Sequence, residues 1–265
     1  MESLMRRLVP VVVILAILAV AVPQPAAAAQ QPSSGEAYLL RLVNKARTGQ
    51  GLRPLRWDKR LADVAQARSN DMAANSYFAH LTSGKLASMV DAEGIKWWRL
   101  GENLARNTYS SVTTSAEVAM RGWRNSSGHW ALLTNAEYNY IAIGGARGVD
   151  GWYYWTALLI KGPDRTPPKS RMLDSRLGSL SSGTRTTRIS WTGHDVKLSS
   201  LTAGLRDFKL QRKVGTNGWK TVTNWTTATA KSFGLRAGKT YRFRVQARDW
   251  KGNKSRWSAA IVVKP

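Results

Sequence analysis

The chain has 265 residues, enough for two domains of ordinary size, and it contains no cysteine, which excludes disulfides, thiolate metal sites and cysteine nucleophiles. Its 40 Lys and Arg against 16 Asp and Glu give a net charge of +24, and so basic a protein attracts polyanions. The charge is uneven, because residues 165–265 hold 22 basic and 4 acidic side chains, a net charge of +18.

The N-terminal segment predicts export. Arg6 and Arg7 precede the apolar run 8–22, and Ala27–Ala29 supply the small residues of a cleavage site. The run has 15 residues, whereas a membrane-spanning helix needs about 20. We therefore expect residues 1–29 to be a signal peptide and the mature protein to be secreted or associated with a bacterial envelope. An uncleaved membrane anchor is the alternative.

The predicted compartment narrows the choice of partner for the basic half. Nucleic acid is not expected outside the cell, whereas anionic wall polymers and lipid headgroups fit the compartment. The alternative is that the positive charge is only a solvated surface. Nothing in the sequence indicates the oligomeric state.

Three segments have the periodicity of amphipathic helices. The first begins near Ser33, where Glu36 completes a capping box, and ends at residues 49–51, which include two glycines. The second follows Asp58, and the third spans residues 115–124. Two β-rich, glycine-bounded runs follow, at 140–144 and 152–160. Helices interleaved with a few strands predict an α-β-α sandwich.

A break follows at residues 161–170, because the segment Gly162–Pro168 contains three prolines and cannot continue a helix or a central strand. We therefore expect one domain at 30–162, a linker at 163–169 and a second domain at 170–265. In the second half, Tyr241–Arg248 alternates apolar and polar residues, as a half-buried strand does. About 95 residues of short strands indicate a β-sandwich, with further strands at 188–191, 208–212, 219–222 and 261–263.

A set of ordered motifs in the first half resembles the CAP superfamily (cysteine-rich secretory proteins, antigen 5 and pathogenesis-related 1) in its bacterial SCP-like branch. The resemblance covers residues 36–160 and implies an α-β-α fold. The motifs are Leu42–Arg47, Gly51–Asp58, Tyr77–His80, Gly101–Ala105 and Trp123–His129.

The second half resembles a fibronectin type III domain. Trp191 ends a candidate strand, and the segment 235–241 reads as the approach to a later strand. Tyr241 would be the corner tyrosine, whose hydroxyl bonds back to upstream backbone. The whole chain is then an α+β protein, a CAP-like sandwich followed by an all-β immunoglobulin-like sandwich.

The CAP resemblance implies a cleft in which His80, Glu102 and His129 could hold a divalent cation such as Zn²⁺. The family's second Glu falls at Ser126, which removes a carboxylate, and Glu117 is a possible substitute. A structural polar network that closes the fold is the alternative.

The expected role is binding at the envelope, with this cleft as the ligand site. A metal-dependent hydrolase of peptide or wall polymer, with Glu102 as base, is a second reading. Lipid or sterol binding is a third, with Trp97 and Trp98 as an aromatic pair beside the cleft. Tryptophans interleaved with arginines in the second half favour structural cation–π stacking over ligand binding.

Overall fold

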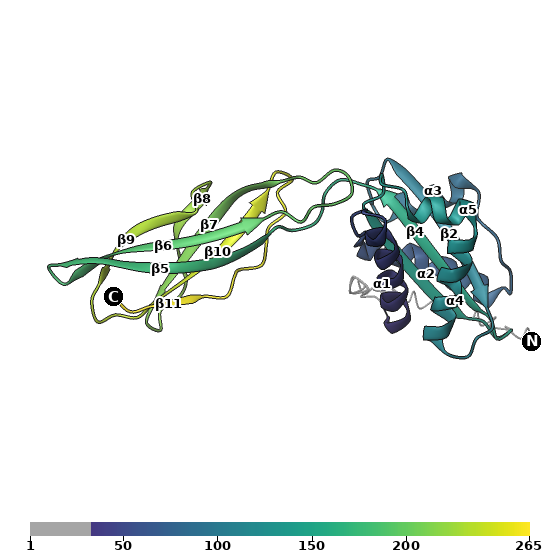
Figure 1. The fold of residues 1–265 in the computed structure, drawn as a ribbon, viewed down its shortest axis with the longest axis horizontal. Helices are drawn as coiled ribbons and strands as arrows, with labels where there is room; N and C mark the ends of the chain where they lie inside the picture. The colour runs from purple at the N-terminus through teal and green to yellow at the C-terminus, as the bar shows by residue number, and fades with distance from the viewer. Residues whose placement is uncertain (1–32) are drawn as a thin grey trace, which may run out of the picture.

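The computed structural model describes residues 33–265, and the predicted signal peptide lies outside this range. Two lobes follow each other along the long axis, an α/β lobe and a β lobe, joined by a narrow waist (Figure 1). Within the described range, no helix has the length and apolar character needed to cross a membrane.

The N-terminal lobe contains five helices, and a side-chain cap sets the start of all but the last of them. Ser33 and Glu36 form the predicted capping box at α1, and Asp58 caps α2 by accepting from the N–H groups of Arg60 and Leu61. The third predicted helix begins three residues early, because Ser111 is its cap. The helices are α1 (Ser34–Gly49), α2 (Lys59–Ala74), α3 (Ser83–Ala92), α4 (Val112–Asn125) and α5 (Ser127–Leu133).

One four-stranded sheet runs through this lobe in the order β1-β3-β4-β2. Only the β1–β3 pair is parallel; the other neighbours are antiparallel. The strands are β1 (Arg56–Trp57), β2 (Arg99–Asn107), β3 (Tyr140–Arg147) and β4 (Tyr153–Lys161). Strand β2 therefore forms one edge of the sheet.

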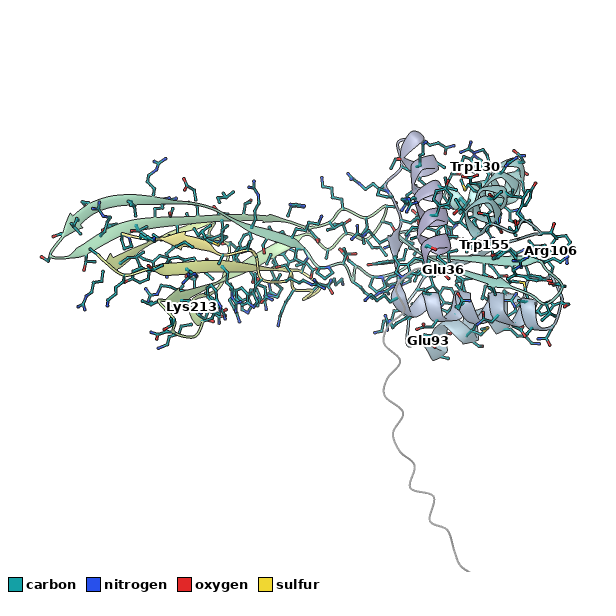
Figure 2. The ribbon with its side chains drawn as sticks, turned by 90° about the horizontal axis from the view of Figure 1, so that it is seen from below. Glu36, Glu93, Arg106, Trp130, Trp155 and Lys213 are labelled. Atoms are coloured by element: carbon teal, nitrogen blue, oxygen red, sulfur yellow. The ribbon has the colours of Figure 1, made fainter. Side chains whose placement is uncertain are left out.

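Helices cover both faces of the sheet, as predicted. On β3, Ile141 and Ile143 pack with α1, α4 and α5, whereas Tyr140 and Ala142 pack with α2 and α3. The strand alternation thus divides the interior into two cores. Trp155 on β4, 1% exposed, lies in the α1–α4 core (Figure 2). Gly144 permits the close approach of α2, since a Cβ there would lie 2.2 Å from the Ala65 carbonyl oxygen.

The C-terminal lobe has a three-stranded sheet, β5-β6-β9, and a four-stranded sheet, β11-β10-β7-β8. Side chains of both sheets form one core that includes Trp191, Phe243 and Val245. Tyr241 accepts a hydrogen bond from the Arg236 N–H at 3.0 Å, the predicted bond to upstream backbone. The strands are β5 (Lys169–Ser181), β6 (Thr184–His194), β7 (Leu205–Val214), β8 (Lys220–Thr226), β9 (Ala230–Arg236), β10 (Tyr241–Asp249) and β11 (Ile261–Val263).

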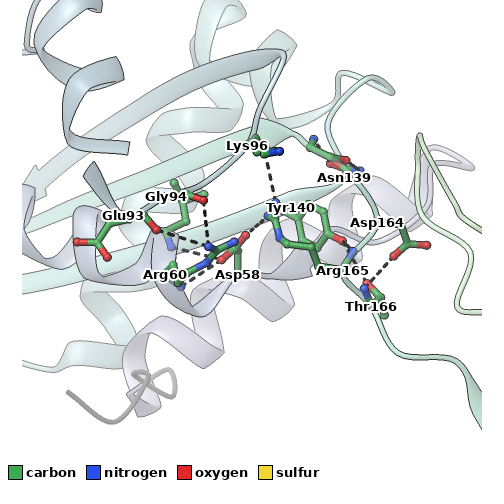
Figure 3. A network of polar contacts seen from close by, with 12 residues as sticks. Asp58, Arg60, Glu93, Gly94, Lys96, Asn139, Tyr140, Asp164, Arg165 and Thr166 are labelled. Atoms are coloured by element: carbon green, nitrogen blue, oxygen red, sulfur yellow. Dashed lines mark hydrogen bonds and ion pairs between the residues drawn. The ribbon is translucent and has the colours of Figure 1, made fainter. Parts of the chain in front are cut away.

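Residues 163–166 are held against the N-terminal lobe at the waist (Figure 3). The Arg165 guanidinium forms an ion pair with Asp58 and lies 4.5 Å from the ring centroid of Tyr140. The Arg165 N–H also donates to the Tyr140 hydroxyl at 2.7 Å. The start of the predicted linker is therefore fixed by several polar contacts, although its proposed bounds stay a prediction.

The β6–β7 loop of the second lobe docks onto the first. Leu198 is 4% exposed and belongs to the α2–α3 core. Ser199 accepts from Arg47 Nη2 at 3.0 Å, and the Ser200 hydroxyl donates to the Glu137 carbonyl at 2.8 Å. The sequence did not predict this contact between the lobes, because nothing in this short, mostly polar loop indicates where Leu198 packs.

The fold contains one strand that matters for the site and that is not among the expected strands at 140–144 and 152–160. Gly101-Glu102-Asn103 lies inside this strand, β2, which pairs with β4 over nine residues. Gly101 is used there for packing, since a Cβ would lie 2.5 Å from Leu132 Cδ1. Glycine at a tightly packed strand position looks, in sequence, like a turn.

Candidate functional site

Glu102 lies on the edge strand β2 and faces α2. Its neighbours Leu100 and Leu104 pack on the α2–α3 side of the sheet, which fixes the direction of the intervening side chain. The Glu102 carboxylate is only 4% exposed. A buried carboxylate needs charge compensation and hydrogen bonds, so its partners decide what the site can do.

Arg68 on α2 supplies the compensating charge. Its Nε lies 3.1 Å from Glu102 Oε1, and the side chain is 1% exposed. The same guanidinium donates to the Tyr77 hydroxyl and to the Ala79 carbonyl, each at 2.8 Å. Arg68 therefore holds both the carboxylate and the α2–α3 loop that carries His80.

His80 completes the network at the surface. Its Nδ1 lies 2.7 Å from Glu102 Oε2, while its side chain is 54% exposed. This contact orients the imidazole. The other ring nitrogen, Nε2, makes no contact with the Glu102 carboxylate. The result is an exposed imidazole on a rigid, buried support.

His129 approaches from the other helical layer, on α5. Asn103 on β2 donates to the His129 carbonyl at 3.0 Å and so ties α5 to the edge strand. Burial, and secondarily the charge of nearby His80, lowers the pKa of His129. A lowered pKa keeps this imidazole neutral, the form that binds metals.

The donor set fits a cation in part. His80 Nε2 and His129 can each offer an imidazole nitrogen, but both Glu102 oxygens already have partners, Arg68 and His80. Within residues 33–265, these three residues are not among the groups whose ligand atoms all lie within 4.8 Å of one another. Ser126, the position of the missing family carboxylate, stands at the N-cap of α5 and makes no capping hydrogen bond with its side chain. Two imidazoles fall short of the three protein ligands usual for catalytic zinc.

Glu117, the possible substitute ligand, is engaged elsewhere. It accepts from the Tyr38 hydroxyl at 2.5 Å across the α1–α4 contact. There it lines a groove that continues to Trp130, with a volume of about 470 Å³ in its larger part. The groove is lined by apolar side chains of α1, α4 and α5 and by exposed basic side chains: Leu42, Ala46, Met120 and Trp130, with Lys45 and Arg124.

The two tryptophans before β2 differ in their surroundings. Trp97 packs against the α2–α3 core, and its Nε1 donates to Asp91 at 2.9 Å. Trp98 is 63% exposed. Three strand residues lie between Trp98 and Glu102, and the four residue steps span roughly 13 Å. Trp98 is therefore the member of the pair available to a ligand, at some distance from the histidines.

The outer face of the four-stranded C-terminal sheet carries alternating cations and indoles. The Arg244 guanidinium carbon lies 4.2 Å from the Trp219 ring centroid and 4.7 Å from that of Trp257. Arg248 lies 4.1 Å from the Trp225 centroid, where Lys209 also packs, at 4.7 Å. The predicted cation–π stacking is present on this face.

Three carboxylates meet where the linker joins the second lobe. Carboxylate oxygens of Asp164, Asp195 and Asp249 lie within 4.8 Å of one another. Among residues 33–265, these three side chains are close enough to share a metal ion. Each carboxylate accepts backbone N–H bonds, for example Asp164 from Thr166 and Ala203. These bonds account for the cluster as a structural feature of the loops.

Sequence reasoning missed Arg68 and Arg47 as key residues. Both are fully buried, and burial lowers the pKa of Arg47 to about 10. Arg47 donates to the carbonyls of Leu133, Asn135 and Arg53 in addition to Ser199. The available signal was an arginine on the apolar face of a predicted helix, since a buried cation must have partners.

Residues 40–159 match the cysteine-rich secretory protein family, CAP. The "Uncharacterized membrane protein YlbC" of Bacillus subtilis strain 168 is 34% identical over 124 residues, 46% of this chain and 33% of that protein. The "Uncharacterized protein YkwD" of the same organism is 34% identical over 134 residues, 49% of each. The chain spans a third to a half of the length of these relatives. An extracellular SCP-domain protein from Bacillus anthracis strain Ames has 29% identity over 48% of this chain and 40% of its own, with a TM-score of 0.41.

Proposed function

We propose that this protein, whose residues 40–159 match the CAP family, is an exported binding protein with its ligand site at His80, Glu102 and His129. Its C-terminal lobe, a fibronectin type III-like module, retains it at an anionic envelope surface. The observation that carries the proposal is the Arg68–Glu102–His80 network, which fixes an exposed imidazole on buried charges. Such a support orients a binding group at the surface.

Binding is favoured over hydrolysis by the state of Glu102. A general base must reach a proton on substrate or water, but both Glu102 oxygens already contact Arg68 or His80. If the protein hydrolysed peptide or wall polymer through this residue, Glu102→Gln would abolish turnover while the fold persisted. We expect no turnover in the parent protein on peptide or wall-polymer substrates.

Zinc titration tests the ligand site. The parent protein should bind Zn²⁺ in a calorimeter, and His80→Ala with His129→Ala should remove that binding. His194→Ala is the matched control, because His194 is exposed at the end of β6 in the other lobe. Binding that survives the double substitution would place the metal elsewhere, and no binding in the parent would make the network purely structural.

Lipid binding is a second candidate, supported by the apolar groove between α1 and α4. A brominated fatty acid should quench Trp130 there, and Ala46→Arg should prevent quenching by filling the groove. Trp98→Phe separates this site from the exposed aromatic before β2, and should leave the quenching in place. Quenching that disappears with Trp98 instead would move the lipid site to that residue.

A further inference from the structure

The C-terminal lobe presents its strongest ordered positive charge on one face. On β10, even-numbered side chains point away from the core that Phe243 and Val245 enter, and they include Arg242, Arg244 and Arg248. Their cross-strand partners on β7 include Lys213, opposite Arg242. Lys209 and Lys254 add charge around Trp225. We call this set the basic sheet face: Lys209, Lys213, Arg242, Arg244, Arg248 and Lys254.

Little acidic charge balances this face. Within the described range 205–265, Arg206 and Arg248 form ion pairs, both with Asp207. Arg242 and Lys213 lie directly opposite each other, and like charges at such positions destabilise a sheet. An anion placed between them would relieve the repulsion. The arrangement is therefore poor as a purely structural device and suited to an anionic partner.

The stacking also fixes where the charges point. Arg244 lies between two indoles, and its Nε and Nη2 donate to Gln211 at 2.9 and 2.7 Å. Trp257 is held over the face by Ser255 and Ser258, whose hydroxyls accept from the N–H groups of Ala247 and Val245. A preordered row of cations loses little conformational freedom on binding.

From these observations we infer that the basic sheet face binds a linear polyanion with a repeating phosphate or carboxylate group. Arg242 and Arg244 lie about 6.7 Å apart along β10, and Arg248 lies about 13 Å further along the strand, so the cations are spread in the direction of an extended polymer. A lipid bilayer fits less well, because Trp219, Trp225 and Trp257 are each covered by a stacked cation and are not free to insert among acyl chains. The inference deepens the proposed envelope retention and rests on it. Lys213 lies on this lobe, away from the CAP domain (Figure 2).

The test compares two pairs of charge-removing substitutions in the full chain. Lys213→Gln with Arg242→Gln removes the like-charged pair from the basic sheet face. Arg188→Gln with Arg236→Gln removes the same charge from exposed positions on the other sheet. Linear inorganic polyphosphate is the polymer probe, and phosphatidylglycerol vesicles are the lipid probe. Thermal unfolding of each variant controls for folding.

We expect the parent protein to bind polyphosphate with an affinity that falls as salt rises, and K213Q/R242Q to weaken it by about tenfold. R188Q/R236Q should change the affinity by less than about threefold, because only its distant field is lost. Equal loss in both variants would overturn the inference in favour of a diffuse charge effect. Binding to vesicles without binding to polyphosphate would overturn it in favour of a lipid surface. Zinc binding at His80 and His129 is read separately, so failure of one proposal leaves the other measurable.

Discussion

At the scale of single residues, two buried arginines organise this protein. Arg68 joins a carboxylate and a loop at the candidate site. Arg47 joins α1 to the Leu133 carbonyl of the first lobe and to the Ser199 hydroxyl of the second. Each guanidinium satisfies several acceptors at once, which a lysine ammonium cannot do in the same planar geometry. The candidate site thus depends on a buried residue, Arg68, that supports its exposed imidazole through Glu102.

Replacing Arg68 by Met should destabilise the fold by about 3–5 kcal/mol, because Glu102 would be left buried without a counter-charge. Lys59→Met is the control, since Lys59 is exposed on the same helix. Urea unfolding followed by tryptophan fluorescence measures both. Adding Glu102→Gln to Arg68→Met should recover part of the loss; strictly additive losses would contradict the pairing.

Asp195 makes stability depend on pH. Burial, and then the carboxylates of Asp164 and Asp249, raises its pKa in the folded protein. A raised carboxyl pKa means that the folded state takes up a proton first, so acidification through this pKa adds stability that neutral pH lacks. The free energy of unfolding of Asp195→Asn should therefore decrease relative to that of the parent as the pH falls from 7 to 4.5. A free-energy difference that stays constant between these pH values, in urea unfolding, would contradict this assignment.

At the scale of elements, the sequence predicts most of the architecture and less of the site. Apolar periodicity predicts α1, α2, α4, β3 and β4, because each buries one face or two on a shared core. Apolar periodicity does not predict the short helices α3 and α5 or the edge strand β2. Their glycines and polar residues are placed by tertiary contacts and not by a local pattern. Glu102 and His129 lie on these unpredicted elements. Motif resemblance could therefore name the site residues, while their partners required the three-dimensional structure.

The segment 255–258 shows a different use of local sequence. Ser255 and Ser258 each present an N–H and a hydroxyl to the edge of β10, so two serines three residues apart replace a strand. Ser258→Ala should leave the buried Val245 N–H without its acceptor and cost about 1–2 kcal/mol. Ser232→Ala on the exposed face of β9 should cost little. Equal unfolding midpoints for the two variants would show that water replaces the serine hydroxyl.

At the scale of the whole molecule, the docked β6–β7 loop joins the two lobes. Leu198→Ala should weaken this contact by about 2–4 kcal/mol, through lost burial and the cavity left behind. The expected consequence is faster trypsin cleavage after Arg165, which the Asp58 and Tyr140 contacts otherwise hold. Leu201→Ala is the control, because Leu201 lies in the same loop and is 44% exposed. Unchanged cleavage in the Leu198 variant would mean that the lobes separate independently of this loop.

The docked loop has a consequence for what the CAP domain can reach. Leu198 and Ser200, seated in the first lobe, restrict how the two lobes turn relative to each other, and they therefore restrict the direction from the basic sheet face to His80. If that face lies along a polymer, as inferred above, the histidines stand at a restricted height and angle above it. Molecules in solution can still diffuse to them, but a second target fixed in the same wall meets them only if it stands within that restricted range.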